Sequence, residues 1–192
     1  MNVRTIHTAA PEKADGTHRR FLERYNDRKL WWLRESLLLL VLIAAVFILF
    51  RFVIGIAIVG GNSMEPTLQD GDFVLYSRIV RQYRPGDVIS MRVPSGEYYV
   101  KRVIAVGGDT VDLQDGRVLV NGEPLQEDRG NGETQEETGA VIYPYKVREG
   151  NVFVLGDNRE VSMDSRAFGE VSRRQIRGKV LFGTGAGGKR IL

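Results

Sequence analysis

The sequence predicts a mainly β domain, built as an antiparallel sheet or a barrel-like fold, preceded by one N-terminal transmembrane helix. Three observations support this fold class. An uncharged apolar segment runs from Ser36 to Phe50. Many short β-branched segments follow it, separated by turns that contain Gly, Asp or Asn. The chain has 192 residues and 22 glycines, which suits one domain of strands and turns with an appendage.

Composition and charge narrow the function. The chain has no cysteine, which excludes disulfides, a thiol nucleophile and cysteine-ligated metals. Residues 1–35 hold eight basic and five acidic residues, which accounts for the whole net charge of +3, so the remainder is neutral. A neutral domain is a poor candidate for a nucleic-acid binder, which gains affinity by neutralising phosphates, and we expect no nucleic-acid partner. We also expect no metal and no cofactor.

The apolar segment is predicted to span a membrane over residues 30–51. Trp31 and Trp32 extend it as an aromatic belt would, and Arg51 can snorkel outward at the other end. Basic residues precede it, so residues 1–29 are expected in the cytoplasm and the domain outside, in a single-pass protein of the cell membrane. A buried core helix would be amphipathic, and this segment is apolar on every face. A cleavable signal peptide is the other reading, although a 35-residue lead-in is long for one.

The strands come next, in a domain expected over residues 52–183. The segment from Phe52 to Val59 is rich in β-branched residues and predicts the first strand. The pairs Asp115-Gly116 and Asn121-Gly122 predict hairpin turns. Polar residues 123–150 are expected to be an insertion or loop, and residues 184–192 a flexible C-terminal tail. Further strands are expected at Phe73–Tyr76, Val88–Arg92, Tyr98–Val106, Thr110–Leu113, Val118–Val120, Val141–Tyr145, Val152–Leu155 and Lys179–Phe182.

Ser63 is a candidate nucleophile without an obvious partner. It lies in the stretch GGNSMEPTL, directly after the first predicted strand. The two histidines, His7 and His18, precede the apolar segment, so an anchored topology puts them across the membrane from Ser63. A simple loop in which Ser63 caps a turn remains an alternative.

A buried lysine can replace histidine as the base. Burial lowers the pKa of a lysine because the charged form loses its water. Among the lysines after the apolar segment, only Lys101 lies within a strongly apolar strand, where it shares a face with Tyr99 and Val103 and Arg102 points the other way. An edge-strand lysine that opposes aggregation is the competing interpretation, and both stay open on the residues alone.

Four motifs, in this order, resemble those of bacterial type I signal peptidases of the Gram-positive-like kind, in peptidase family S26. These enzymes are membrane-anchored serine proteases with a Ser-Lys dyad. The resemblance covers residues 30–183. The motifs are GNSMEPTL at 61–68, RPGDV at 84–88, KRVIAVGGD at 101–109 and GDNREVSMDSR at 156–166.

The resemblance implies a role for each site residue. Ser63 is expected to attack the scissile carbonyl, Lys101 to act as the general base and Ser162 to orient the amine. In some members a serine two positions before the nucleophile stabilises the oxyanion, and Gly61 lacks that hydroxyl. The supporting residues are expected to be Asp157, Asn158, Asp164 and Arg166, and the substrate pocket to be formed by Ala57, Val59, Met91, Tyr99, Val100 and Val154.

The implied function is the removal of N-terminal signal peptides from secreted preproteins, by cleavage after small-x-small sequences. Preproteins and membrane lipid are the expected partners, and the sequence predicts no oligomeric state. Self-cleaving repressors have a similar Ser-Lys core, but they cut an Ala-Gly pair upstream of the serine. The Ala-Gly pair here, at residues 186–187, lies downstream. An anchored, catalytically silent binding module is the alternative from another class.

Overall fold

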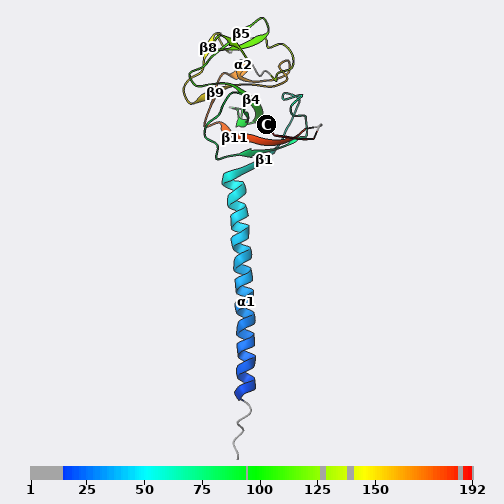
Figure 1. The fold of residues 1–192 in the computed structure, drawn as a ribbon, viewed down its shortest axis with the longest axis vertical. Coiled ribbons are helices and arrows are strands. Elements are labelled where there is room, and N and C mark those ends of the chain that lie inside the picture. The colour runs from blue at the N-terminus through cyan, green and yellow to red at the C-terminus, as the bar shows by residue number, and fades with distance from the viewer. Residues whose placement is uncertain (1–14, 94, 126–128, 138–140, 186–187, 192) are drawn as a thin grey trace, which may run out of the picture. The chain divides into compact units, whose positions relative to one another are not determined.

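The computed structural model describes residues 15–93, 95–125, 129–137, 141–185 and 188–191. It forms two compact units, Met1–Ile48 and Leu49–Leu192. The first contains helix α1, Asp15–Ile48, and the second contains all the strands (Figure 1).

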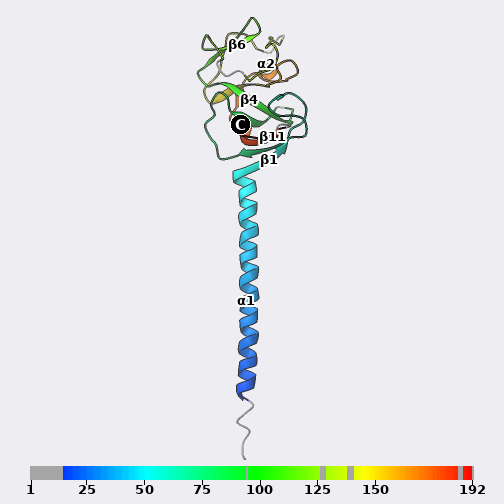
Figure 2. The ribbon, with the colours of Figure 1, turned by 45° about the vertical axis from the view of Figure 1, so that its right-hand side comes forward.

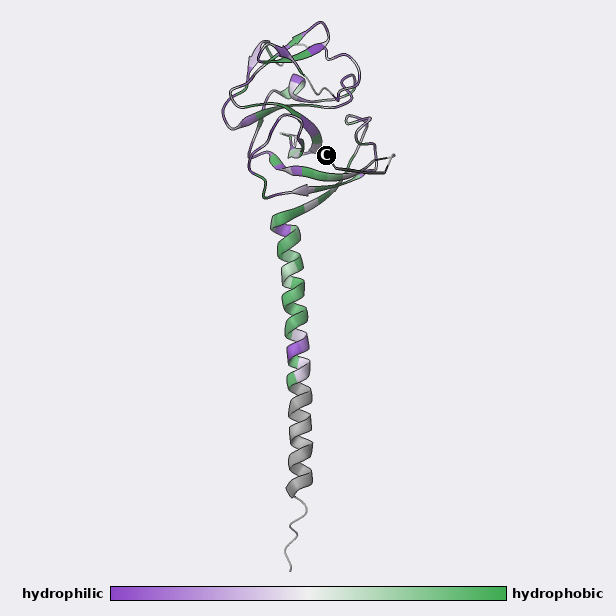
Figure 3. Cartoon of the chain, viewed as in Figure 1, coloured by the Kyte–Doolittle hydropathy of each residue, from purple (hydrophilic) through white to green (hydrophobic). Residues whose placement is uncertain are grey.

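Helix α1 confirms the predicted apolar helix. The 24 residues Leu30–Val53 are long and apolar enough to cross a membrane, and Figure 3 shows this part of the helix mostly in green, with a purple band near each end. The side chains from Leu30 to Phe50 are exposed, as those of a core helix would not be. The helix begins at Asp15, so the segment expected as a cytoplasmic tail is helical from there on. Residues 1–14 lie outside the described part of the chain.

The chain reaches its first strand later than predicted. A π-helical turn, Leu49–Val53, follows α1, and β1 covers Ile54–Ile58. The helical hydrogen bonding continues through Phe52 and Val53 although both residues favour strands, so local propensity does not decide this boundary.

The larger sheet is antiparallel and confirms the predicted mainly β class. Its order is β1-β2-β11-β3-β4-β9-β10, and β12 pairs with β11. β4 therefore lies inside the sheet, between β3 and β9. The bounds are Phe73–Ser77 for β2, Val88–Arg92 for β3, Tyr98–Val106 for β4, Asn151–Leu155 for β9, Val171–Ser172 for β10, Ile176–Gly185 for β11 and Gly188–Ile191 for β12.

A second sheet of four strands has the order β7-β6-β5-β8. It lies at the opposite end of its unit from β1 (Figures 1 and 2). Both predicted hairpin turns form, with positive φ at Asp115, Gly116, Asn121 and Gly122, as type I′ turns require. The bounds are Thr110–Gln114 for β5, Arg117–Val120 for β6, Glu123–Pro124 for β7 and Tyr145–Lys146 for β8.

Two predictions about the later part of the chain need correction. The strand expected at Val141–Tyr145 is reduced to Tyr145–Lys146, because Pro144 has no N–H to donate to a ladder. The C-terminal segment expected as a flexible tail is partly strand, since Gly188–Ile191 pair with β11. Residues 186–187 and 192 lie outside the described part.

Three buried clusters support the larger sheet and its loops. One joins Met64 and Leu68, which follow Ser63, to Val74 on β2. Another contains Val103 on β4 with its neighbours on β3 and β9. A third lies between β4, β9 and the small sheet around Phe153. The first two clusters fix the two segments that carry the candidate nucleophile and the candidate base.

Candidate active site

Ser63 lies in a loop that closes on itself. The Val59 N–H donates to the Asp72 carbonyl at 2.8 Å, and the Gly61 N–H donates to Asp70 Oδ1 at 2.7 Å. Gly61 has a φ of +80°, which glycine adopts without strain. Met64 is buried directly after Ser63 and anchors the loop in the core. Ser63 itself is half-buried, between an exposed glycine turn and a fixed apolar anchor.

Lys101 lies on β4 with its side chain buried, so the interpretation as an exposed edge-strand lysine is wrong. It pairs with Ile89 of β3, and β9 begins to pair one residue later, at Arg102. Its side chain is 2% exposed, and its Nζ donates a hydrogen bond to Ser162 Oγ at 2.9 Å. Burial lowers the pKa of Lys101 from 10.5 to about 8, opposed in part by the negative charge of Asp164.

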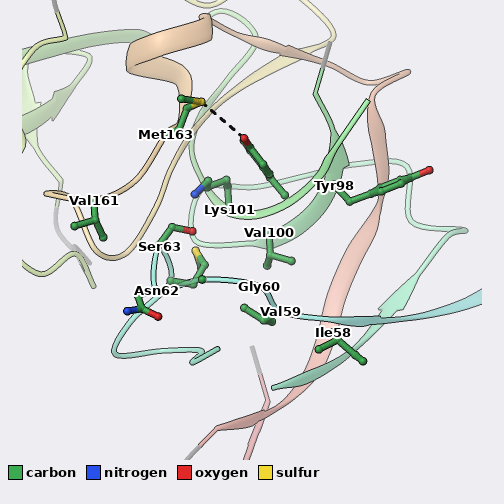
Figure 4. Close-up of a pocket in the computed structure, with 13 residues that line it drawn as sticks. Ile58, Val59, Gly60, Asn62, Ser63, Tyr98, Val100, Lys101, Val161 and Met163 are labelled. Carbon is green, nitrogen blue, oxygen red and sulfur yellow. Dashed lines mark hydrogen bonds between the residues drawn. The ribbon is translucent and has the colours of Figure 1, made fainter. Parts of the chain in front are cut away.

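Ser63 and Lys101 share one pocket of about 220 Å³. Its walls are residues 58–64, residues 98–101 and the pair Val161 and Met163. In Figure 4 the Ser63 hydroxyl and the Lys101 amine point toward one another inside it. A hydroxyl beside an amine with a lowered pKa can act as a nucleophile with its general base.

The loop after β9 contacts both candidate groups. The Asn158 N–H donates to the Ser63 carbonyl at 3.0 Å. A Cβ on Gly156 would lie 2.2 Å from Ser162 Oγ and 2.4 Å from the Ser63 carbonyl oxygen, so only glycine fits there. Ser162 is 5% exposed and accepts the hydrogen bond from Lys101. The predicted supporting residue Asn158 is thus joined to the nucleophile loop through its backbone.

Asp164 and Arg166 hold the turn that carries Ser162. Both are buried, and Arg166 Nε and Nη2 donate to the two Asp164 oxygens at 2.9 and 3.0 Å. Asp164 also caps the short helix α2, Ser165–Phe168, and accepts from the Gly156 N–H at 3.0 Å. Arg166 Nη2 donates in addition to the Ser162 carbonyl at 3.2 Å. This ion pair therefore connects the Ser162 turn to Gly156 and to α2.

A second buried ion pair, Arg102–Asp157, links the segments of the site. Arg102 Nε and Nη2 donate to the Asp157 carboxylate at 2.8 and 2.6 Å. Nη1 donates to the Gly86 carbonyl at 2.8 Å, and Nη2 lies 3.4 Å from Thr67 Oγ1 in the nucleophile loop. Strand alternation predicts that Arg102 points away from Lys101, but the sequence gives no sign of these partners.

The segment 129–137, part of the predicted insertion, also supports the site. Arg159 is buried, and it donates to the Gly156 carbonyl at 2.9 Å and to Thr134 Oγ1 at 2.7 Å. The Asn131 N–H donates to the Asp157 carbonyl at 2.6 Å. The insertion thus braces the 156–166 loop, which its polar composition does not reveal.

The predicted pocket residues divide into two groups. Val59, Tyr99 and Val100 line the pocket. In the part of the chain that the structure describes, Ala57, Met91 and Val154 do not. Ala57 packs beside the cluster of Met64 and Leu68. Met91 and Val154 are fully buried, opposite Tyr99 and Val103, so they help to keep the Lys101 face dry instead of meeting a substrate.

The pocket also has lining residues that were not predicted, among them Ile58, Tyr98, Val161 and Met163. Each of these residues is close in the sequence to a motif residue, and this position is the signal that could have predicted them. Among the described residues, no group of three or more His, Asp or Glu could hold a metal ion.

Comparison with known proteins identifies relatives. A family model described as signal peptidase, peptidase S26, matches residues 32–184. Signal peptidase IB of Staphylococcus aureus (strain N315) is 36% identical over 154 residues, which cover 71% of this chain and 81% of the relative. A probable signal peptidase I-1 of a Synechocystis species is 33% identical over 164 residues, covering 79% and 82%.

A solved structure is also similar in sequence. A signal peptidase I from Enterococcus faecalis V583 is 31% identical, with coverage of 52% of this chain and 97% of that chain. The two structures superpose with a TM-score of 0.45.

Proposed function

Because the chain belongs to the signal peptidase family, peptidase S26, we propose that Ser63 is its nucleophile and Lys101 its general base. The chain is a serine endopeptidase that removes signal peptides, and a Ser/Lys mechanism is general for its family. One observation carries the residue assignment. Lys101 is 2% exposed, its amine is hydrogen-bonded to Ser162, and it shares a pocket with Ser63.

Acylation begins with the uncharged amine of Lys101. It takes the Ser63 proton while Oγ attacks the scissile carbonyl carbon, and a tetrahedral oxyanion forms. The backbone N–H of Ser63 is the first donor to this oxyanion. The carbon–nitrogen bond then breaks, Lys101 returns the proton to the leaving amine, and the signal peptide remains as an ester on Ser63.

Deacylation uses the same amine. Lys101 takes a proton from water, the resulting hydroxide attacks the ester carbonyl, and the proton returns to Ser63 Oγ as the ester bond breaks. Ser162 keeps the Nζ atom in place through both steps, because its hydroxyl accepts a hydrogen bond at 2.9 Å. Asp164 and Arg166 serve this purpose indirectly by fixing the turn around Ser162.

The substrate binds as an extended strand at an open edge of β4. Tyr98–Arg102 pair with β3 on one side, whereas β9 pairs with β4 only from Arg102 onward. Residues 98–101 line the pocket, and their backbone can receive a peptide by strand addition. Val59 and Val100 narrow the pocket, and this supports cleavage after small side chains.

Anchoring and orientation complete the proposal. Relatives of the signal peptidase I kind are membrane-anchored, and α1 supplies one apolar helix. We assign the N-terminus to the cytoplasm and the strand domain to the other side, from the basic residues before the span. Ile56, Ile58 and Phe73 on β1 and β2 are exposed and apolar, which suits contact with lipid.

The test is cleavage of a secreted precursor that carries an Ala-x-Ala cut site, by the full chain in detergent micelles. Ser63→Ala and Lys101→Met are expected to abolish cleavage. Lys146→Met, at an exposed lysine outside the pocket, serves as the matched control and should cleave as the parent does. Cleavage by Ser63→Ala at the parent rate would refute the assignment.

A further inference from the structure

We propose that Val161 and Met163 form the surface that receives the first residues of the mature protein, on the leaving side of the cleaved bond. This inference rests on the proposed function of Ser63. It assigns residues that select the part of the substrate after the cleaved bond, which β4 does not contact.

The first observation is an alternation of exposure around Ser162. Val161 is 63% exposed, Ser162 5% and Met163 60%. The hydroxyl points inward to Lys101, and its two neighbours point outward. They are the two apolar side chains in the segment GDNREVSMDSR, which is otherwise polar or glycine. Exposed apolar side chains that line a pocket are a common mark of a binding surface.

The second observation is position. Val161 and Met163 form the third wall of the pocket. In Figure 4 Val161 lies on the opposite side of Ser63 from Val100, Tyr98 and Ile58. A peptide whose residues before the cleaved bond lie along Tyr98–Val100 must continue past Ser63 on the Val161 side. The part of the substrate after the cleaved bond therefore passes along Val161 and Met163.

The third observation concerns Met163 and the catalytic amine. The Tyr99 hydroxyl lies 3.7 Å from Met163 Sδ, and it also donates to Glu97 Oε2 at 3.1 Å. The Tyr99 ring also lies 5.5 Å from the Lys101 Nζ atom. Tyr99 therefore links Met163 to the amine that must protonate the leaving nitrogen, and both residues line the same pocket. An apolar surface there favours small or apolar first residues, because a charged one would lose water without gaining a partner.

The experiment separates the two halves of the substrate. Peptides share one sequence up to the cleaved bond, and the residue after it is Leu or Asp. A matched ester carries the same acyl part and a methyl alcohol leaving group. For Val161→Ser and for Met163→Ser, we expect the preference for Leu over Asp, measured as kcat/KM of acylation, to fall about fivefold. Ester cleavage should fall much less.

Ile142→Ser is the matched control, because Ile142 is 88% exposed and lies outside the pocket. It should keep the parent preference. An unchanged Leu-to-Asp preference in both pocket variants would overturn the inference, as would equal losses on peptide and ester. Ser63→Ala, run in parallel, tests the proposed function by itself. If it loses all cleavage while the preference stays constant in the other variants, only the inference about the leaving side fails.

Discussion

Replacing Lys101 with methionine should stabilise the protein while it abolishes cleavage. The lysine amine is buried with a pKa of about 8, below its ordinary value of 10.5. A pKa that is lower in the folded state means that the unfolded chain binds more protons between these two values. The free energy of unfolding of the parent protein therefore rises as pH rises from about 8 to 10.5, and below this window the fold bears the full cost of burying the charge.

The magnitude follows from the size of the shift. At pH 7 the difference between the two pKa values corresponds to about 3 kcal/mol of lost stability. Methionine fills a similar volume without charge, but the hydrogen bond to Ser162 is lost, which costs about 1 kcal/mol. We therefore expect Lys101→Met to be more stable than the parent by about 2 kcal/mol at pH 7.

The assay is urea unfolding of the full chain in micelles, at pH 7 and again at about pH 11.5, above the ordinary pKa of lysine. The advantage of Lys101→Met should disappear at the higher pH, since the parent amine is then neutral in both states. Lys146→Met, at an exposed lysine, should differ little from the parent at either pH. If Lys101→Met is less stable than the parent at pH 7, or if its advantage does not change with pH, then burial does not lower the pKa of Lys101 as described.

Three further predictions concern activity and positioning. In steady-state kinetics kcat/KM should rise with pH, with a midpoint near 8, as Lys101 loses its proton. In thermal unfolding, Arg102→Met should lower stability by about 3 to 5 kcal/mol, because it leaves Asp157 buried without its partner; a loss under 1 kcal/mol would contradict this. Gly156→Ala should reduce cleavage about a hundredfold, because its Cβ must displace Ser162; parent activity would contradict this.

Local sequence signals predicted most of the strands. The bounds of β3 and β4 agree with the predicted ranges, because β-branched runs there end at clear turns. The Asp-Gly and Asn-Gly turns also form as predicted. Alternation on β4 correctly assigned Lys101 and Arg102 to opposite faces. The face of the sheet toward which a side chain points depends only on its own strand, so a short stretch of sequence is enough to predict it.

What depends on distant partners was not predictable from the residues. Lys101 was compatible with an exposed lysine on an edge strand until its burial and its hydrogen bond to Ser162 were known. Arg102 and Asp157 are 55 residues apart, and nothing local to either indicates the other. Segment 129–137 has the composition of a surface loop, and only the contacts of Arg159 reveal that it braces the site. Met91 and Val154 have suitable chemistry for a pocket wall, but register buries them behind it.

The same buried amine offers a handle for selective chemistry. With a pKa of about 8, roughly a tenth of Lys101 is uncharged at pH 7, against about one in three thousand for an ordinary lysine. Aldehydes and other electrophiles that react with free amines would therefore modify this position first, provided that they fit the pocket. An inhibitor built on that principle would capture the base and leave the serine untouched.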